Sequence, residues 1–179
     1  MCIRDSVKDL AIDGVHADVL YPSVSLGLFG INDTALLRPI LSAYNDWLAE
    51  FCGSHPKVLK GIAAILLEDD IPAGISEMKR AAGLGLSGAM ISVYPGQGYF
   101  YDEPVYDPFW AAAQELNMPI SLHVGTGRLG RSQLVEDGKV VQTGADRSNS
   151  DHWVRMSLSH LVLGGVFERF PELKIINVD

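Results

Sequence analysis

The chain has 179 residues, of which 47% are hydrophobic and 20% are charged, a composition typical of one soluble globular domain. Its formal net charge of -8 argues against the basic surface that nucleic acids and anionic membranes attract, so we expect neither as a partner. Its two cysteines form no disulfide framework, and residues 1–6 are too short and polar for a signal peptide, so we expect a cytoplasmic protein.

Short apolar segments bounded by glycine, proline or aspartate predict five buried β-strands. The second of them is almost continuously apolar, as a strand buried on both faces should be. The predicted strands cover residues 17–21, 58–67, 88–94, 119–124 and 173–178.

A helix is predicted in each interval between two strands, because apolar residues recur there at spacings of three and four. Asp33 or Thr34 begins the first helix, Asp70 caps the second, and Asp107 with Pro108 begins the third. The predicted helices span residues 34–53, 71–82, 108–117 and 151–162. This alternation of strands and helices predicts an α/β fold with a parallel sheet.

The fourth predicted strand ends in His123, directly before a glycine-rich segment. Parallel sheets surrounded by helices carry their chemistry at the carboxyl ends of the strands, and an imidazole there can bind a metal or move a proton. The alternative is a histidine that only forms a hydrogen bond with its loop. His160, by contrast, lies inside an apolar helix pattern, and we expect it to pack.

The segment after His123 also supports a second hypothesis. Gly125-Thr-Gly-Arg-Leu-Gly130 has the glycine spacing of a dinucleotide-binding turn, and Asp146 follows at about the distance of a ribose-binding acid. No clean helix pattern follows this turn, however, which argues against nucleotide binding. Residues 125–147 instead predict a long irregular loop, and such loops in compact domains are usually functional.

The whole pattern resembles the amidohydrolase-related family that includes aminocarboxymuconate-semialdehyde and resorcylate-type decarboxylases. The segments that carry the resemblance are residues 13–22, 44–48, 85–88, 106–113, 121–125 and 164–171, in the family's order. The resemblance implies a distorted (β/α)8 barrel, in which these strands would be the second to the sixth. A typical barrel needs about 250 residues, so we interpret residues 7–179 as an incomplete amidohydrolase-related domain and residues 1–6 as an extraneous leader.

The resemblance further implies a divalent metal, Zn²⁺ or alternatively Mn²⁺, with His123 as one ligand. The family's His-x-His pair and late aspartate have no counterpart in this sequence. Asp179 ends the last strand where family members carry a catalytic histidine or an acidic residue, although aspartate is also a common strand-terminal residue. Strand ends and the loop supply the candidate substrate-binding residues, which are Tyr21, Ser23, Tyr94, Arg128 and Arg131.

Arg128 and Arg131 are candidates because a guanidinium group can hold a carboxylate by two hydrogen bonds; the alternative is a solvated loop. The sequence therefore predicts a metal-dependent enzyme that hydrolyses or non-oxidatively decarboxylates a small carboxylated substrate, with aromatic acids among the candidates. Two alternatives stay open: a nucleotide-binding module, and an inactive barrel fragment whose open strand edges associate into oligomers. Since one histidine is not a metal site, we expect little activity and weak metal affinity from the 179-residue chain alone.

Overall fold

A computed structural model describes residues 3–22, 24–96, 99–127, 135–136, 139–140 and 144–178. Five parallel strands form one sheet in the order β1-β2-β3-β4-β7, which confirms the predicted α/β architecture. Their bounds are β1 Asp18–Leu20, β2 Leu59–Ala64, β3 Gly88–Ile91, β4 Ile120–His123 and β7 Ile175–Val178. The strands follow one another across the sheet in chain order, as they do around part of a (β/α)8 barrel.

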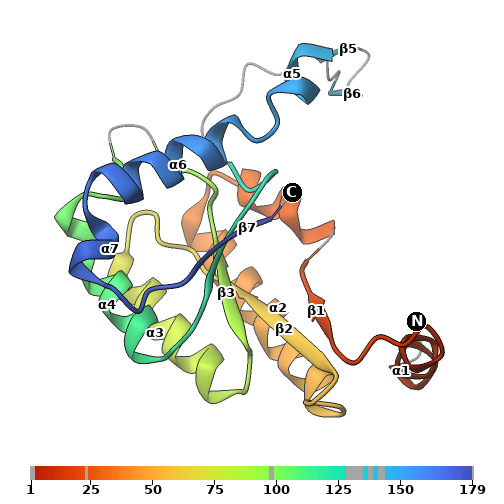
Figure 1. Ribbon diagram of the computed structural model, residues 1–179. Helices are drawn as coiled ribbons and strands as arrows, with labels where there is room; N and C mark the ends of the chain where they lie inside the picture. Colours follow the sequence, from red (N-terminus) through yellow and green to blue (C-terminus); the bar gives the residue numbers. More distant parts are fainter. Residues whose placement is uncertain are drawn as a thin grey trace.

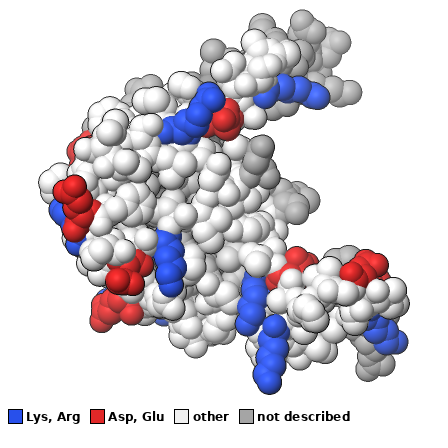
Figure 2. All heavy atoms as spheres, in the orientation of Figure 1, with Lys and Arg blue, Asp and Glu red and all other residues white. Residues whose placement is uncertain are grey.

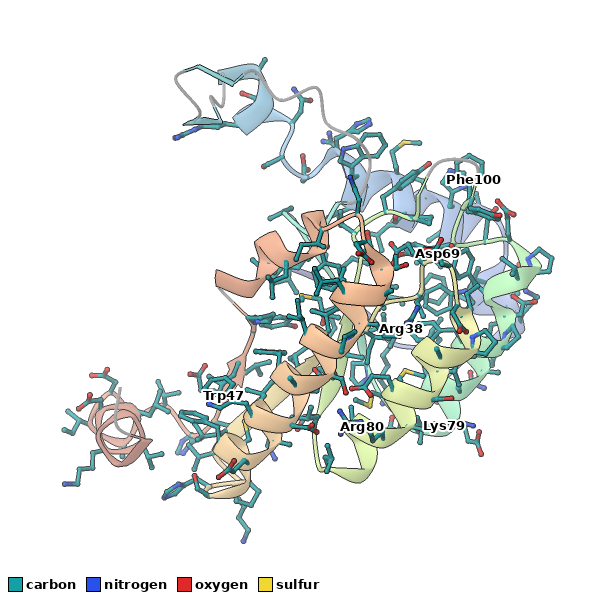
Figure 3. The ribbon with its side chains drawn as sticks, turned by 180° about the vertical axis from the view of Figure 1, so that it is seen from behind. Arg38, Trp47, Asp69, Lys79, Arg80 and Phe100 are labelled. Carbon is teal, nitrogen blue, oxygen red and sulfur yellow. The ribbon has the colours of Figure 1, made fainter. Side chains whose placement is uncertain are left out.

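Helices cover one face of this sheet and leave the other face open (Figures 1 and 3). The helices between the strands are α2 (Thr34–Gly53), α3 (Ile71–Gly83), α4 (Asp107–Glu115), α6 (His152–Leu163) and α7 (Val166–Arg169). On the open face, Val19 of β1 is 51% exposed and Ile176 of β7 is 40% exposed. Figure 2 shows that this side of the molecule carries few charged atoms at its centre. The curved sheet with helices on one side confirms a partial barrel.

Alternation along the strands divides the core into two hydrophobic clusters. Leu59, Ala63 and Ile65 face the helices and pack in the larger cluster with Leu48 of α2 and Met78 of α3. Ile62 and Ala64 of β2 and Met90 of β3 point to the opposite face, and they pack in the smaller cluster with Leu37 and Leu41 of α2. A short 3-10 helix, η1 (Val24–Gly30), adds the buried Phe29 to this smaller cluster.

The predicted helix starts agree with the structure. The Asp33 carboxylate accepts a hydrogen bond from the backbone N–H of Leu36 at 3.0 Å, and the Asp70 carboxylate accepts one from Ala73 at 2.8 Å. Farther along α2, Arg38 donates hydrogen bonds to the carbonyls of Leu66 and Glu68, at 3.0 and 3.1 Å. Figure 3 shows Arg38 and Asp69 at the join between α2 and the loop after β2. These bonds fix the helix against the carboxyl end of β2.

Several predicted boundaries are wrong. β2 ends at Ala64 and β3 at Ile91, whereas the sequence predicted strands to residues 67 and 94. The residues beyond each strand are just as buried, so hydrophobicity alone did not mark where the ladder stops. η1 replaces part of a predicted loop, and α1 (Ile3–Ile12) was not predicted. Helix α1 takes in part of residues 1–6, and the leader interpretation of that segment stays a prediction.

The long segment after β4 is described only in part. It contains a two-stranded antiparallel hairpin, β5 (Val135–Glu136) with β6 (Lys139–Val140), and a short helix α5 (Gly144–Ser148). Figure 1 shows these elements beyond the carboxyl ends of the strands, on the same side as η1. Within the described ranges, no helix is long and apolar enough to cross a membrane.

A polar network joins α2 to α3 beside the sheet. Arg80 of α3 donates to the Glu77 carboxylate at 2.8 Å and also pairs with Asp46 of α2. Burial opposes ionisation of Glu77, but hydrogen bonds from Arg80 and Asn45 outweigh it and lower the pKa of Glu77 below its ordinary value. In Figure 3, Arg80 lies between the two helices. Glu77 is therefore more readily ionised in the folded protein than in the unfolded chain.

We expect this network to make stability depend on pH. Because the pKa of Glu77 is lower in the folded protein, its contribution is present above the unfolded carboxyl value of about 4.3 and is lost as the pH falls through the folded value. Urea unfolding at about pH 7 and pH 3 measures this dependence. Between the two pH values, the free energy of unfolding should fall less for Glu77→Gln than for the unmodified protein. Equal losses in both proteins would contradict the role of Glu77.

Candidate metal and substrate site

His123 ends β4, and its side chain lies on the open face of the sheet, half-buried, beside Val178 of β7. Its Nδ1 atom is 2.7 Å from the carbonyl oxygen of Val124. A carbonyl oxygen can only accept a hydrogen bond, so Nδ1 is the donor, and in the neutral ring Nε2 then carries the lone pair. This is the arrangement in which histidines bind metals, with the distal nitrogen as ligand and the other held by a hydrogen bond.

Two hydroxyl groups lie on the same face of the sheet as His123. The ring of Tyr21, which follows β1, meets the His123 ring edge-on with centroids 5.7 Å apart. The Tyr21 hydroxyl is 2.9 Å from the hydroxyl of Ser121, which is buried two residues before His123 in β4. The structure thus brings the predicted residues Tyr21 and His123 together and adds Ser121 to them.

Ser121 was not among the predicted site residues. The signal for it was present, because residues two apart in a strand point to the same face, and Ser121 therefore shares a face with His123. A buried serine in an otherwise apolar strand also needs a hydrogen-bond partner. The partner, Tyr21, is 100 residues away in the sequence, which is why the pair was not visible there.

Tyr94 has a different environment from Tyr21. It is 7% exposed and packs against Trp153 of α6, with ring centroids 4.8 Å apart, and against Phe100 and His160. Burial, and then the negative charge of Asp102, raise the pKa of Tyr94 above its ordinary value, which keeps its hydroxyl protonated. These contacts place Tyr94 in the cluster that faces the helices, and its substrate-binding role stays a prediction.

His160 packs, as expected from its helix pattern. Its ring stacks on Phe100 with centroids 4.2 Å apart, and its Nδ1 lies 3.1 Å from the Asp102 carboxylate. Gly164, after α6, allows this contact, because a Cβ there would lie 2.3 Å from the Cβ of Asp102. The cluster fixes the loop that precedes α4 against α6.

The other predicted site residues, Ser23, Arg128, Arg131 and Asp179, lie outside the described residues. Among the residues that the structure does describe, no three His, Cys, Asp or Glu side chains lie close enough to hold a metal ion together. The described part of the chain thus fits one ligand position, His123, rather than a closed metal site.

The glycine motif after His123 begins as a turn. Gly125 has φ of +91°, and the backbone N–H of Thr126 bonds back to the His123 carbonyl at 3.3 Å. In the described chain the next helix is α5, which begins at Gly144 after the β5–β6 hairpin. A dinucleotide-binding turn would open directly into a helix whose N-terminus holds the phosphates. The described elements do not have that order.

Comparison with known proteins identifies relatives along nearly the whole chain. The family profile described as Amidohydrolase matches residues 5–177. Gamma-resorcylate decarboxylase of Rhizobium sp. (strain MTP-10005) is 30% identical over 138 residues, which cover 74% of this chain and 41% of that protein. The 2-keto-4-carboxy-3-hexenedioate hydratase of Sphingobium sp. (strain NBRC 103272 / SYK-6) is 25% identical over 181 residues, covering 97% of this chain and 48% of that protein. The chain therefore spans less than half the length of these relatives.

Solved structures share the fold. The 2,6-dihydroxybenzoate decarboxylase complexed with 2,6-dihydroxybenzoate superposes with a TM-score of 0.71 at 23% identity, over 96% of this chain and 54% of that one. The 5-carboxyvanillate decarboxylase of Novosphingobium aromaticivorans, with bound manganese, gives a TM-score of 0.73 at 22% identity, over 97% and 48%. At these identities the likeness is one of fold.

Proposed function

Since the chain belongs to the amidohydrolase family, we propose that it forms part of an active site in which His123 binds a divalent metal and a small aromatic carboxylate is the substrate. The observation that carries the proposal is the hydrogen bond from His123 Nδ1 to the Val124 carbonyl. It leaves Nε2 as a free ligand atom on the open face, at the carboxyl end of a central strand.

The metal would supply Lewis-acid stabilisation of negative charge on a bound oxygen, or a nucleophilic water at neutral pH. Zn²⁺ is one candidate ion, and Mn²⁺ is the other because a 5-carboxyvanillate decarboxylase of the same fold contains manganese. Tyr21 and Ser121, next to His123, would form hydrogen bonds with polar substituents of the substrate. The few charged atoms at the centre of this side of the molecule suit an aromatic ring.

Non-oxidative decarboxylation is the reaction we favour over hydrolysis, since gamma-resorcylate decarboxylases are among the relatives. In this reaction the bond between the ring and its carboxylate breaks and carbon dioxide leaves. The electron pair of the broken bond stays on the ring carbon. A proton then adds to that carbon, so no oxidant or reductant is needed. Asp179 stays the predicted catalytic residue, in the role of orienting water or moving this proton, and Ser23, Tyr94, Arg128 and Arg131 stay predicted substrate contacts. A cytoplasmic location and association through open sheet edges are likewise predictions.

The proposal is tested by incubating the gene product that contains this chain with 2,6-dihydroxybenzoate after chelation and again after adding Mn²⁺ or Zn²⁺. We expect loss of the substrate and formation of the decarboxylated phenol only when metal is present, measured by liquid chromatography. The 179-residue chain alone should bind metal weakly, because it supplies one described ligand. Stoichiometric binding of a nicotinamide cofactor without any effect of metal would overturn the proposal in favour of the nucleotide-binding alternative.

A further inference from the structure

The turn after His123 is tied to the neighbouring strand by one buried residue, Thr126. Its side chain is 0% exposed. Its hydroxyl accepts a hydrogen bond from the backbone N–H of Val93, just beyond β3, at 2.8 Å, and donates one to the His123 carbonyl at 2.8 Å. Its own carbonyl accepts a hydrogen bond from Ser92 at 3.0 Å. Thr126 thus connects the carboxyl ends of β3 and β4.

These hydrogen bonds fix the turn that contains Val124, whose carbonyl oxygen accepts the hydrogen bond from His123. The turn runs from His123 to Thr126 and closes through the Thr126 N–H and hydroxyl, which both reach the His123 carbonyl. Its third residue, Gly125, has φ of +91°, which glycine adopts without strain. Val124, the second residue of the turn, provides the oxygen that receives the proton on His123 Nδ1. The direction of that oxygen is set by the turn.

We propose that Thr126 is a positioning residue for His123. By anchoring the turn to β3, it holds the Val124 carbonyl in place and thereby selects the His123 tautomer that presents Nε2 to a metal. The inference rests on the proposed function, since positioning matters only if His123 is a ligand. Removing groups that orient a ligating histidine typically weakens metal binding by about 10- to 100-fold.

A purely structural role for Thr126 would have a different signature, and the chain offers a matched control. Ser157 of α6 is also buried and also bonds to Val93, but through the Val93 carbonyl, at 2.7 Å. Ser157→Ala removes one buried hydrogen bond at the same residue, just beyond β3, and leaves the turn after β4 intact. Thr126→Val removes the hydroxyl with little change in shape, and Thr126→Ser retains it.

The experiment records the ring nitrogen and carbon-bound proton signals of histidine by NMR at about pH 8, where free imidazoles are neutral, and then adds Mn²⁺. In the unmodified chain, in Thr126→Ser and in Ser157→Ala, His123 should be the Nδ1–H tautomer, and its signals should broaden first among the histidines. In Thr126→Val, the ratio of the Nδ1–H tautomer of His123 to its Nε2–H tautomer should fall by about tenfold. The same broadening of the His123 signals should then need about tenfold more Mn²⁺.

The outcomes separate this inference from the proposed function. A folded Thr126→Val with the original tautomer and Mn²⁺ response overturns the positioning role and leaves the metal role standing. A tautomer that shifts in Thr126→Val, with no broadening of His123 in the unmodified chain, supports positioning and overturns the metal role. If Thr126→Val does not fold, Thr126→Cys replaces it: the weaker thiol hydrogen bonds should give an intermediate tautomer ratio, and an unchanged ratio overturns the inference.

Discussion

Replacing Asn45 by alanine should lower the free energy of unfolding by about 3 kcal/mol, because three hydrogen bonds of a buried side chain are lost. Asn45 is 0% exposed. Its amide nitrogen donates to the Ala64 carbonyl at 3.1 Å and to Glu77 at 2.7 Å, and its oxygen accepts the Ala64 N–H at 2.8 Å. Pairing between β1 and β2 ends at Leu20 and Gly61. Beyond that point, the Asn45 amide of α2 takes the place of a strand partner for the backbone of Ala64.

Urea denaturation would measure this effect, with Ser42→Ala as the control. Ser42 lies one turn earlier on α2 and accepts a hydrogen bond from Arg80 in the same network, at 2.9 Å, but it leaves no backbone group of the sheet unpaired when removed. We expect that control to cost less than about 1 kcal/mol. If Asn45→Ala costs no more than Ser42→Ala, the amide does not substitute for a strand partner.

Most of the fold was predictable because it follows from local patterns. The apolar segments between turn residues identified all five strands of the main sheet, and Asp33 and Asp70 marked helix starts that the structure confirms. Helix α1 and η1 were not predicted. The burial of Phe29, a residue of η1, depends on residues of α2, β2 and β3 that are distant in the sequence.

The site was predictable only where strand ends mark it. His123 could be singled out because it ends an apolar strand before glycine, and Tyr21 because it ends the first. Tyr94 fits the same pattern but packs among helix residues. It lies beyond the last paired residue of β3, where the alternation of a strand no longer fixes the direction of a side chain. Thr126 and Ser121 were missed because their partners, Val93 and Tyr21, are brought to them by the sheet.

Replacing His123 by alanine should abolish metal-dependent turnover and barely change stability. Metal ions contribute several kcal/mol to the stabilisation of charge in a transition state, and each 1.36 kcal/mol is a factor of ten in rate, so we expect a loss of at least about 100-fold. The ring is only half-buried, and its described contacts are a hydrogen bond to its own loop and the edge of Tyr21. The unfolding free energy should change by less than about 1 kcal/mol.

His160→Gln is the matched control, because His160 is also partly buried but stacks on Phe100 and pairs with Asp102. That variant should keep its turnover and lose stability, the reverse of His123→Ala. Both quantities are measured on the same two proteins, turnover with added Mn²⁺ or Zn²⁺ and unfolding with urea. If His123→Ala keeps more than about a tenth of the activity with the same metal dependence, the metal is bound without it. Loss of turnover in His123→Ala and loss of stability in His160→Gln would show that His123 acts in the reaction and His160 in the fold.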